Sequence, residues 1–278
     1  MPTSDNQALS LSVITFNTWN CQGDYRTRLT LMETGLRALA PDLLLLQEVF
    51  ATPRECENTA RFLAKQLDMK VTFHPARAKV RRLNGEAITC TSGLAILSRH
   101  NIVWSEKVVL PQDPRDGERI AQFAEIRIGR ARLLVVNLHL SHLEYAENLR
   151  RQQLEHIAER IENVWDHEQI LLGGDFNATE HSSLFEALNN RLALRIARAG
   201  SDLPIGLGVD HLFALSRANG APASITPARS VLDRKDDVSG LYPSDHVGIM
   251  ANITLAALSR TRPKTVTSVS HEGNPRRI

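Results

Sequence analysis

Polar side chains that can handle metal ions and phosphate esters occur in five places along the chain. Each group ends or interrupts an apolar run whose length and composition are typical of a β-strand. Carboxylates, amides and histidines gathered at strand ends are what a metal-assisted phosphoryl-transfer site needs, and five groups in one chain indicate one shared site. The segments are TFNTWN with Asn17, LLLLQEV with Glu48, NLHLSH with His139, GGDFNA with Asp175 and Asn177, and the triplet Ser244-Asp245-His246.

The spacing within these groups suits the chemistry of phosphate esters. Such esters resist attack because their anionic oxygens repel nucleophiles, so a catalyst must offset charge, activate water and align it with the leaving group. Asp175 and Asn177 are two residues apart, so in an extended segment they share a face and can point at one phosphate. Asp245 and His246 are adjacent, and one turn would present both side chains. Taken alone, each residue also fits an ordinary turn or surface position.

The apolar runs predict the elements that must position these residues. Hydrophobic spacing predicts helices from Arg26 to Ala40 and over Leu154 to Val164, with Pro41 ending the first. Strands outnumber helices, which favours a sheet packed on a sheet with flanking helices over a simple alternation of strand and helix. The predicted strands are Leu9–Phe16, Leu43–Leu46, SGLAILS, Ile120–Ile128, Leu133–Leu140, Ile170–Leu172, His211–Leu215 and Val247–Leu255, and a short helix is predicted near Ser183–Leu188.

Two further segments lead to specific expectations. Thr52-Pro53-Arg54-Glu55 fits a helix-capping box with proline at the first helical position, followed by an apolar stripe that reaches Leu67. The polar stretch HPARAKVRRLNGEAITCTS predicts a long loop with a short strand. Its basic side chains either line a groove for a polyanion or belong to a solvated loop, which is the commoner arrangement. They are Arg77, Lys79, Arg81 and Arg82.

Composition argues against several classes of protein. The net charge of +2 suits a phosphate-bearing substrate but falls short of a strongly basic nucleic-acid-binding domain. Cys21, Cys56 and Cys90 are odd in number and widely spaced, which supports neither a disulfide framework nor a zinc site. The N-terminus lacks a signal-peptide pattern, and no stretch approaches the ~20 apolar residues of a membrane span. We therefore expect a cytoplasmic protein.

Together, the Ser-Asp-His triplet preceded by Tyr-Pro, the GDFNA segment and the LQEV segment resemble the endonuclease/exonuclease/phosphatase superfamily of DNase I-like phosphoesterases. The resemblance spans Leu9 to Leu255. It implies an α/β (α+β) fold in four α/β/β/α layers, in which two mixed β-sheets pack face to face between flanking helices. The expected domain organisation is an N-terminal extension over residues 1–8, a catalytic domain over 9–258 and a disordered basic tail over 259–278.

The resemblance also implies a role for each residue of the site. Glu48 would be the principal magnesium ligand, with Asn17 and Asp245 nearby, and manganese would suit the same oxygen donors. His246 would act on the attacking water or stabilise the transition state, oriented by Asp210 in GVDHLF. The remaining residues are Asp175, which would protonate the leaving oxygen or position water, and His139 and Asn177, which would contact the phosphate. Apart from the resemblance, Arg81 and Arg82 of the basic stretch are expected as further substrate contacts.

The chain is thus expected to be a magnesium-dependent hydrolase of phosphate esters, with phosphodiesters of nucleic acid as the favoured substrate. The alternative enzyme is a phosphatase or phosphodiesterase that acts on a small metabolite or, like the sphingomyelinases, on a phospholipid head group. Steep salt dependence would favour the polyanion, and weak dependence the small substrate. A non-catalytic binding protein on the same fold is a third alternative, but it predicts a damaged site, and here every site residue is present. No protein partner can be inferred.

Overall fold

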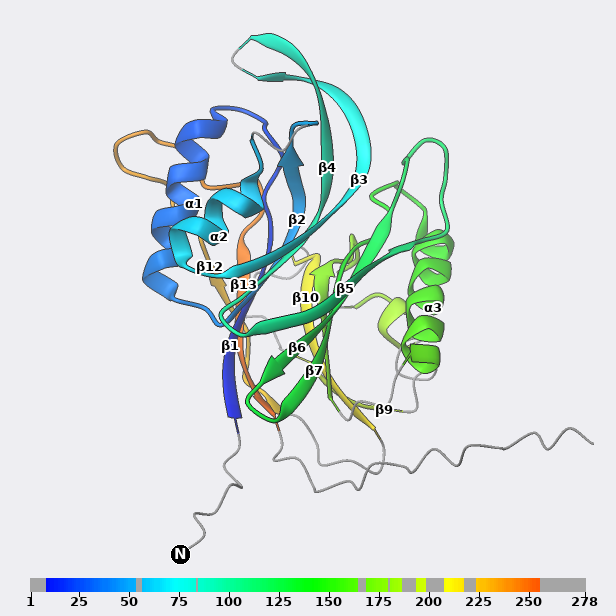
Figure 1. Ribbon diagram of the computed structural model, residues 1–278. Coiled ribbons are helices and arrows are strands. Elements are labelled where there is room, and N and C mark those ends of the chain that lie inside the picture. Colours follow the sequence, from blue (N-terminus) through cyan, green and yellow to red (C-terminus); the bar gives the residue numbers. More distant parts are fainter. Residues whose placement is uncertain are drawn as a thin grey trace, which may run out of the picture.

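The structure is a computed structural model that describes residues 9–53, 57–83, 85–164, 169–179, 181–186, 194–198, 208–217 and 224–255. Within these residues, two β-sheets pack face to face and helices cover their outer faces (Figure 1). One sheet has seven strands and the other has six. The four-layered sandwich with two mixed sheets, expected from the sequence, is confirmed.

The first sheet runs in the order β11-β13-β1-β2-β4-β3, with β12 also paired to β13. Its strands are β1 (Leu9–Asn17), β2 (Leu43–Ala51), β3 (Lys70–Leu83), β4 (Glu86–Ser98), β11 (Ser224–Ile225), β12 (Arg229–Val231) and β13 (Gly248–Leu255). The second sheet runs in the order β5-β6-β7-β8-β10-β9. Its strands are β5 (Asn101–Val109), β6 (Ile120–Ile128), β7 (Ala131–His139), β8 (Gln169–Asp175), β9 (Leu194–Arg198) and β10 (Asp210–Arg217). The pairs β1–β2 and β7–β8 are parallel, and the other pairs are antiparallel.

The continuous apolar run in β2 follows from its position in the middle of the sandwich. Leu43 and Leu45 point between the two sheets, where they join the core formed by both inner faces. Leu44 and Leu46 point the other way, into the core beneath the helices. Because both faces of the strand are buried over Leu43–Leu46, these positions are all apolar, and the pattern is continuous instead of alternating.

In the described part of the chain, helices α1 (Tyr25–Leu39), α2 (Thr59–Leu67) and α3 (Glu147–Val164) form the outer layers. Helices α1 and α2 cover the first sheet, and α3 covers the second (Figure 1). The backbone N–H of Thr27 donates to the side chain of Asp24, which caps the start of α1 at 3.1 Å. Both α1 and α3 occur where hydrophobic spacing predicted helices, although α3 begins several residues earlier than predicted.

The predicted start of α2 is wrong. The helix begins at Thr59, and its N-cap is Asn58, whose Oδ1 accepts a hydrogen bond from Arg61 N at 3.0 Å. Thr52 instead accepts a bond from Glu57 N at 3.1 Å, because a bridge between Ala51 and Asn58 brings the chain back on itself before the helix starts. Residues 54 and 55 of the predicted capping box lie outside the described residues.

The predicted long loop with one short strand is also wrong. Strands β3 and β4 form a long antiparallel hairpin, which pairs from Lys70↔Ser98 to Leu83↔Glu86 and arches beyond the sandwich (Figure 1). Backbone hydrogen bonds hold the hairpin together while much of its surface is exposed to solvent, so its side chains need not alternate between apolar and polar. Strand β5, which pairs with β6, was not predicted.

Some predictions fall on residues that the structure does not describe. The N-terminal extension and the basic tail lie outside the described residues, as does the end of the predicted short helix, of which residues 184–186 are helical. Among the described residues, no helix is long and apolar enough to cross a membrane.

Candidate active site

Strand register brings three of the predicted residues into one row at the edge of the second sheet. His139 pairs with Asp175 in the parallel β7–β8 ladder, and Asp175 pairs with Asp210 in the antiparallel β8–β10 ladder. From the first sheet, Asn17 at the end of β1 reaches the same place, and its Nδ2 donates to Asp175 Oδ2 at 3.0 Å. Side chains from distant parts of the chain therefore meet where the two sheets pack.

The two glycines of the GGDFNA segment allow β8 to reach this position. A Cβ on Gly174 would lie 2.0 Å from the carbonyl oxygen of Leu138, and the φ angle of Gly174 is +145°. A Cβ on Gly173 would lie 2.6 Å from Leu212 Cδ2. Any larger residue would push β8 away from its neighbours and displace the carboxylate of Asp175.

Asp175 Oδ2 is the centre of the polar cluster. His139 Nε2 lies 3.4 Å from this oxygen, and His246 Nε2 lies 3.9 Å from it. The other ring nitrogen of His246, Nδ1, is 2.8 Å from Asp210 Oδ2. This hydrogen bond fixes the imidazole so that Nε2 faces Asp175, which is the arrangement of a carboxylate–imidazole pair that handles protons.

Burial and neighbouring charges shift the pKa values of these groups. Burial raises the pKa of Asp175, and the adjacent Asp210 raises it further, to about 7. Burial alone would lower the pKa of His246, but the hydrogen bond and charge of Asp210 outweigh it and raise the pKa to about 9. Burial, followed by the positive charge of Arg119, holds the pKa of His139 well below its ordinary value. Near neutral pH the cluster can therefore hold a transferable proton while His139 stays uncharged.

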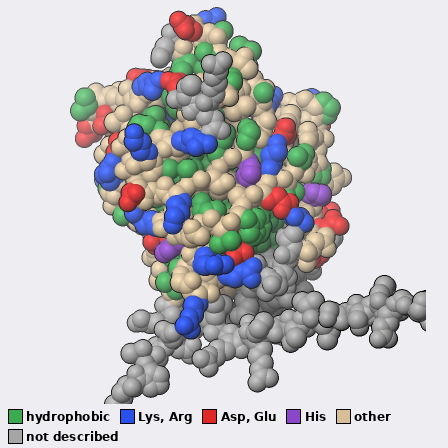
Figure 2. Space-filling model, in the orientation of Figure 1, with side chains coloured by type: hydrophobic (Ala, Val, Ile, Leu, Met, Phe, Trp, Pro, Cys, Tyr) green, Lys and Arg blue, Asp and Glu red, His purple; other side chains and the backbone are tan. Residues whose placement is uncertain are grey.

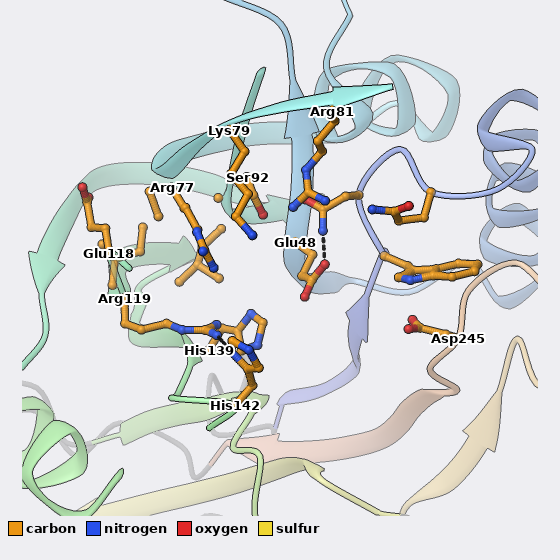
Figure 3. Close-up of a pocket in the computed structure, with 17 residues that line it drawn as sticks. Glu48, Arg77, Lys79, Arg81, Ser92, Glu118, Arg119, His139, His142 and Asp245 are labelled. Carbon is orange, nitrogen blue, oxygen red and sulfur yellow. Dashed lines mark hydrogen bonds between the residues drawn. The ribbon is translucent and has the colours of Figure 1, made fainter. Parts of the chain in front are cut away.

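Glu48 occupies a bulge in β2. The β2–β4 register shifts between Leu46 and Val49, and Glu48 has a φ angle of 51°, in the left-handed region that a residue with a side chain rarely adopts. The bulge interrupts the inward and outward alternation of the strand. Its effect is to direct the carboxylate into the pocket, across from His139 (Figure 3).

The residues around Glu48 fit a divalent cation. Burial raises the pKa of Glu48, and the negative charges of Asp175 and Asp245 raise it further, by more than the positive charges of Arg81 and Arg119 lower it. A cation bound beside Glu48 would therefore stabilise its ionised carboxylate. Asn20 Nδ2 donates to Glu48 Oε2, and the Oδ1 atom of Asn20 is buried with no hydrogen-bond partner among the described residues. Carboxylate and amide oxygens are the donors that Mg²⁺ and Mn²⁺ prefer.

A second group of potential ligand atoms lies nearby. One atom each from Asp175, Asp210 and His246 falls within 4.8 Å of the other two. Asp210 Oδ1 is buried and has no hydrogen-bond partner among the described residues. The candidate site therefore offers two neighbouring places for a cation, one at Glu48 and one at Asp175.

The last two motif segments are tied to the same edge. Asn177 has a φ angle of 48°; its backbone N–H donates to Asp175 Oδ1 at 2.9 Å and its Nδ2 donates to the carbonyl of Leu140 at 3.1 Å. Ser244 Oγ donates to the carbonyl oxygen of Asn17 at 2.7 Å, which attaches the Ser-Asp-His turn to the end of β1. Asp245 is exposed and lines the pocket.

The hairpin supplies a basic wall to the pocket. Arg77, Lys79 and Arg81 alternate along β3, so they share one face, and Figure 3 shows Arg77 pointing toward Arg119 and Arg81 near Glu48. Arg82 belongs to the other face. It is exposed, does not line the pocket, and donates through Nη1 to the carbonyl of Gly85 at 3.0 Å. The two arginines predicted as substrate contacts are thus separated by the pleat of the strand.

Sequence reasoning missed three residues of the site. Asn20 bonds to Glu48, Arg119 lines the pocket, and the guanidinium of Arg28 is buried beneath the loop that carries the site. Arg28 donates to the carbonyl oxygens of Thr18, Trp19, Asn20, Gln22 and Pro243. Asn20 could have been suspected, since it lies in the same TFNTWN segment as Asn17. The sequence carries no signal for the two arginines, because most charged residues of loops and helices face solvent.

Comparisons with known proteins show a family match and the same fold. The sequence matches the Endonuclease/Exonuclease/phosphatase family over residues 17–246. Among solved structures, D. rerio TDP2 complexed with single strand DNA product has a TM-score of 0.65 and 17% identity, covering 88% of this chain and 98% of that one. The human Nocturnin catalytic domain with bound sulfate has a TM-score of 0.68 and 17% identity, and the match covers 89% of this chain and 95% of that one. An endonuclease/exonuclease/phosphatase family protein from Bacteroides thetaiotaomicron has a TM-score of 0.65 and 16% identity, and the match covers 89% of this chain and 98% of that one. The search of curated proteins found no match.

Proposed function

The chain belongs to the endonuclease/exonuclease/phosphatase family, whose members are phosphoesterase hydrolases, and from this premise we propose that it is a metal-dependent phosphodiesterase of nucleic acid. The observation that carries the proposal is the convergence of three side chains on one oxygen of Asp175. The distances to Asp175 Oδ2 are 3.0 Å from Asn17 Nδ2, 3.4 Å from His139 Nε2 and 3.9 Å from His246 Nε2. A carboxylate held in this way, near Glu48 and the other oxygen donors that fit a cation, suits hydrolysis of a phosphate ester.

Glu48, Asn17 and Asp245 are the proposed ligands of the metal, and the buried amide oxygen of Asn20 is a fourth candidate. Magnesium is the proposed cofactor, and manganese suits the same oxygen donors. When bound, the cation offsets the charge of the phosphate oxygens and disfavours the imidazolium form of His246, which frees Nε2 to accept a proton.

The remaining residues account for the proton transfers. Water attacks phosphorus in line, so that a new P–O bond forms while the P–O bond to the leaving group breaks. His246, oriented by Asp210, accepts the proton of the water at Nε2, and Asp175 donates a proton to the leaving oxygen. His139 and Asn177 contact the non-bridging oxygens of the phosphate in this proposal.

The basic wall supports a nucleic-acid substrate. Among the described residues, no carboxylate forms an ion pair with Arg77, Lys79 or Arg81, so their charges are available to phosphate groups. In addition, a protein of the same fold, D. rerio TDP2, has been solved with single strand DNA product. A polyanionic strand would pass along β3 with its scissile phosphate near Glu48.

One observation favours the alternative, a small metabolite or a phospholipid head group. Figure 2 shows acidic and basic side chains interspersed over the face of the molecule that it presents. The net charge of the chain is only +2. A substrate compact enough to sit within the pocket would need no continuous basic surface.

A panel of substrates would distinguish the nucleic-acid proposal from the small-substrate alternative. Supercoiled plasmid, end-labelled single-stranded DNA and RNA, bis(p-nitrophenyl) phosphate and sphingomyelin would be incubated with the protein in magnesium, with chelator as the control. We expect magnesium-dependent cleavage of nucleic acid, with affinity that falls steeply as salt rises. Hydrolysis confined to the small substrates, with little response to salt, would overturn the nucleic-acid proposal and support the alternative.

A further inference from the structure

A buried carboxylate holds Arg119 at the edge of the pocket. Asp116 is fully buried, and its Oδ1 lies 2.6 Å from Arg119 Nη2 and 2.6 Å from His142 Nδ1. Only 11% of the Arg119 side chain is exposed, and its Nε is buried with no hydrogen-bond partner among the described residues. Asp116 therefore fixes the guanidinium in place at the wall of the pocket.

Arg77 approaches the same place from the hairpin. Gly117, within the turn that carries Asp116 and Arg119, has a φ angle of +78°, and a Cβ there would lie 3.0 Å from Arg77 Nε. The absence of a side chain at Gly117 thus lets the hairpin arginine pack against the turn. Figure 3 shows Arg77, Lys79 and Arg119 on the same side of the pocket.

Asp116 offsets one of the three positive charges of this cluster, and the charges of Arg77 and Lys79 are not paired with a described carboxylate. Glu118 also lines the pocket, but its Oε1 is paired with Lys107 Nζ at 2.9 Å. Burial and then the neighbouring positive charges of Arg77 and Arg81 lower the pKa of Lys79, and the negative charge of Glu48 offsets this lowering only in part.

We propose that Arg119, Arg77 and Lys79 form a second phosphate subsite, which binds the phosphate group next to the scissile one in the substrate. The inference rests on the proposed function, because it takes the Glu48 end of the pocket as the place of cleavage. Both ends belong to one pocket, so a ligand anchored near Glu48 extends toward Arg119. Guanidinium groups suit this task, since their planar donors match the oxygens of a phosphate.

Binding of two small ligands tests the subsite. Thymidine 3′,5′-bisphosphate carries a second phosphate that thymidine 5′-monophosphate lacks, and the affinity of the protein for each would be measured by calorimetry in magnesium. We expect the bisphosphate to bind about tenfold more tightly or better, because charge-assisted hydrogen bonds are worth roughly that much. Equal affinity of the wild-type protein for the two ligands would overturn the proposal.

Single substitutions would show which residues are responsible for the preference for the bisphosphate. Arg119→Gln should remove most of the preference for the bisphosphate, and Arg77→Gln, on the partly exposed hairpin, should reduce it without disturbing the buried Asp116. Arg127→Gln is the matched control, because Arg127 is an exposed arginine at the far end of β6 from the pocket. Loss of the preference in Arg127→Gln to the same extent would mean a general effect of charge and would contradict a built subsite.

Kinetics separate this inference from the proposed function. Thymidine dinucleotides with no terminal phosphate, with a 5′-phosphate or with a 3′-phosphate would be compared as substrates in magnesium. We expect one of the phosphorylated forms to have about a tenfold higher kcat/KM, and Arg119→Gln to reduce that ratio. Hydrolysis of all three forms at equal rates would overturn the subsite alone. Failure to hydrolyse any of them, with the bisphosphate still preferred in binding, would overturn the proposed function alone.

Discussion

At the scale of single residues, Glu48 combines a strained backbone with a destabilised charge. Its left-handed φ angle of 51° costs roughly 1–3 kcal/mol for a residue with a Cβ. Its pKa is raised by burial and by the charges of Asp175 and Asp245, so in the absence of a cation the ionised form destabilises the folded protein. The backbone strain and the buried charge both destabilise the fold, which is expected if Glu48 serves to bind a ligand and not to stabilise the protein.

Replacement of Glu48 by glutamine should weaken magnesium binding. We expect Glu48→Gln to bind magnesium at least about tenfold more weakly, because a neutral amide replaces the charged ligand. In chelator, its thermal unfolding midpoint should equal or exceed that of the wild type, since the uncompensated buried charge is gone. Calorimetry and thermal unfolding with and without magnesium would check both points. If magnesium stabilises Glu48→Gln as much as it stabilises the wild type, the cation does not bind at Glu48. The group formed by Asp175, Asp210 and His246 would then be the first candidate for the metal site.

Asp116 should make stability depend on pH in a defined window. Burial alone would raise its pKa, but hydrogen bonds from Arg119 and Ser141 outweigh burial and hold the pKa below its ordinary value. A depressed folded pKa stabilises the protein above the unfolded pKa of about 3.8, and that contribution is lost as pH falls through the folded value. Asp116→Asn should therefore cost about 3 kcal/mol at neutral pH and progressively less below about pH 4.

Urea unfolding across this pH range would measure the difference between Asp116→Asn and the wild type. Asp237→Asn, which alters an exposed carboxylate, is the control and should differ little from the wild type at every pH. A difference for Asp116→Asn that stays constant between pH 7 and pH 3 would contradict the ionised pair with Arg119.

At the scale of elements, the close approach of β7 and β8 sets the position of Asp175. Gly174→Ala would place a Cβ 2.0 Å from the carbonyl oxygen of Leu138 at a φ angle of +145°. We expect this change to reduce the free energy of unfolding by about 3 kcal/mol or more. Gly129→Ala is a matched control, since Gly129 also has a positive φ angle, +60°, but nothing lies within 4 Å of its Cβ position. It should cost about 1 kcal/mol. Equal losses in chemical denaturation would contradict a steric requirement at Gly174.

The pleat of β3 predicts different effects for neighbouring arginines. Arg81 lines the pocket, whereas Arg82 lies on the other face. If nucleic acid binds along the basic wall, Arg81→Gln should reduce the slope of log affinity against log salt by about 1, and Arg82→Gln should leave the slope unchanged. Titration of labelled single-stranded DNA at several salt concentrations would measure the slopes. The same reduction in both variants would indicate a general loss of charge and no defined contact.

The sequence predicted those elements whose periodicity comes from burial. The apolar run Leu43–Leu46 and the helix around Leu29 and Met32 were recognisable because their side chains fill the core. The β3–β4 hairpin was not recognisable, because pairing between its two strands satisfies the backbone while its side chains stay partly exposed. The start of α2 was misplaced because a good cap at Thr52 competes with a chain reversal that only the fold determines.

At the scale of the whole molecule, the candidate site exists because two sheets pack together. The first sheet supplies Asn17 and Glu48, and the second supplies His139, Asp175 and Asp210. These residues could be predicted from sequence because each belongs to a short motif. Arg119 could not, since its importance comes from Asp116 and from the hairpin that folds over it, and neither relation is local in sequence.

The measurement that tests the account most directly is phosphodiester hydrolysis by the wild type and by Asp175→Asn. Turnover of single-stranded DNA and of bis(p-nitrophenyl) phosphate would be followed in magnesium and in chelator, with Asp237→Asn as the control and thermal unfolding to verify the fold. We expect hydrolysis that requires magnesium, and a loss of about 10²–10⁴-fold in kcat for Asp175→Asn, because a positioned proton donor contributes on that order. Folded wild-type protein that hydrolyses neither substrate in magnesium, or Asp175→Asn that stays within about tenfold of it, would contradict the account.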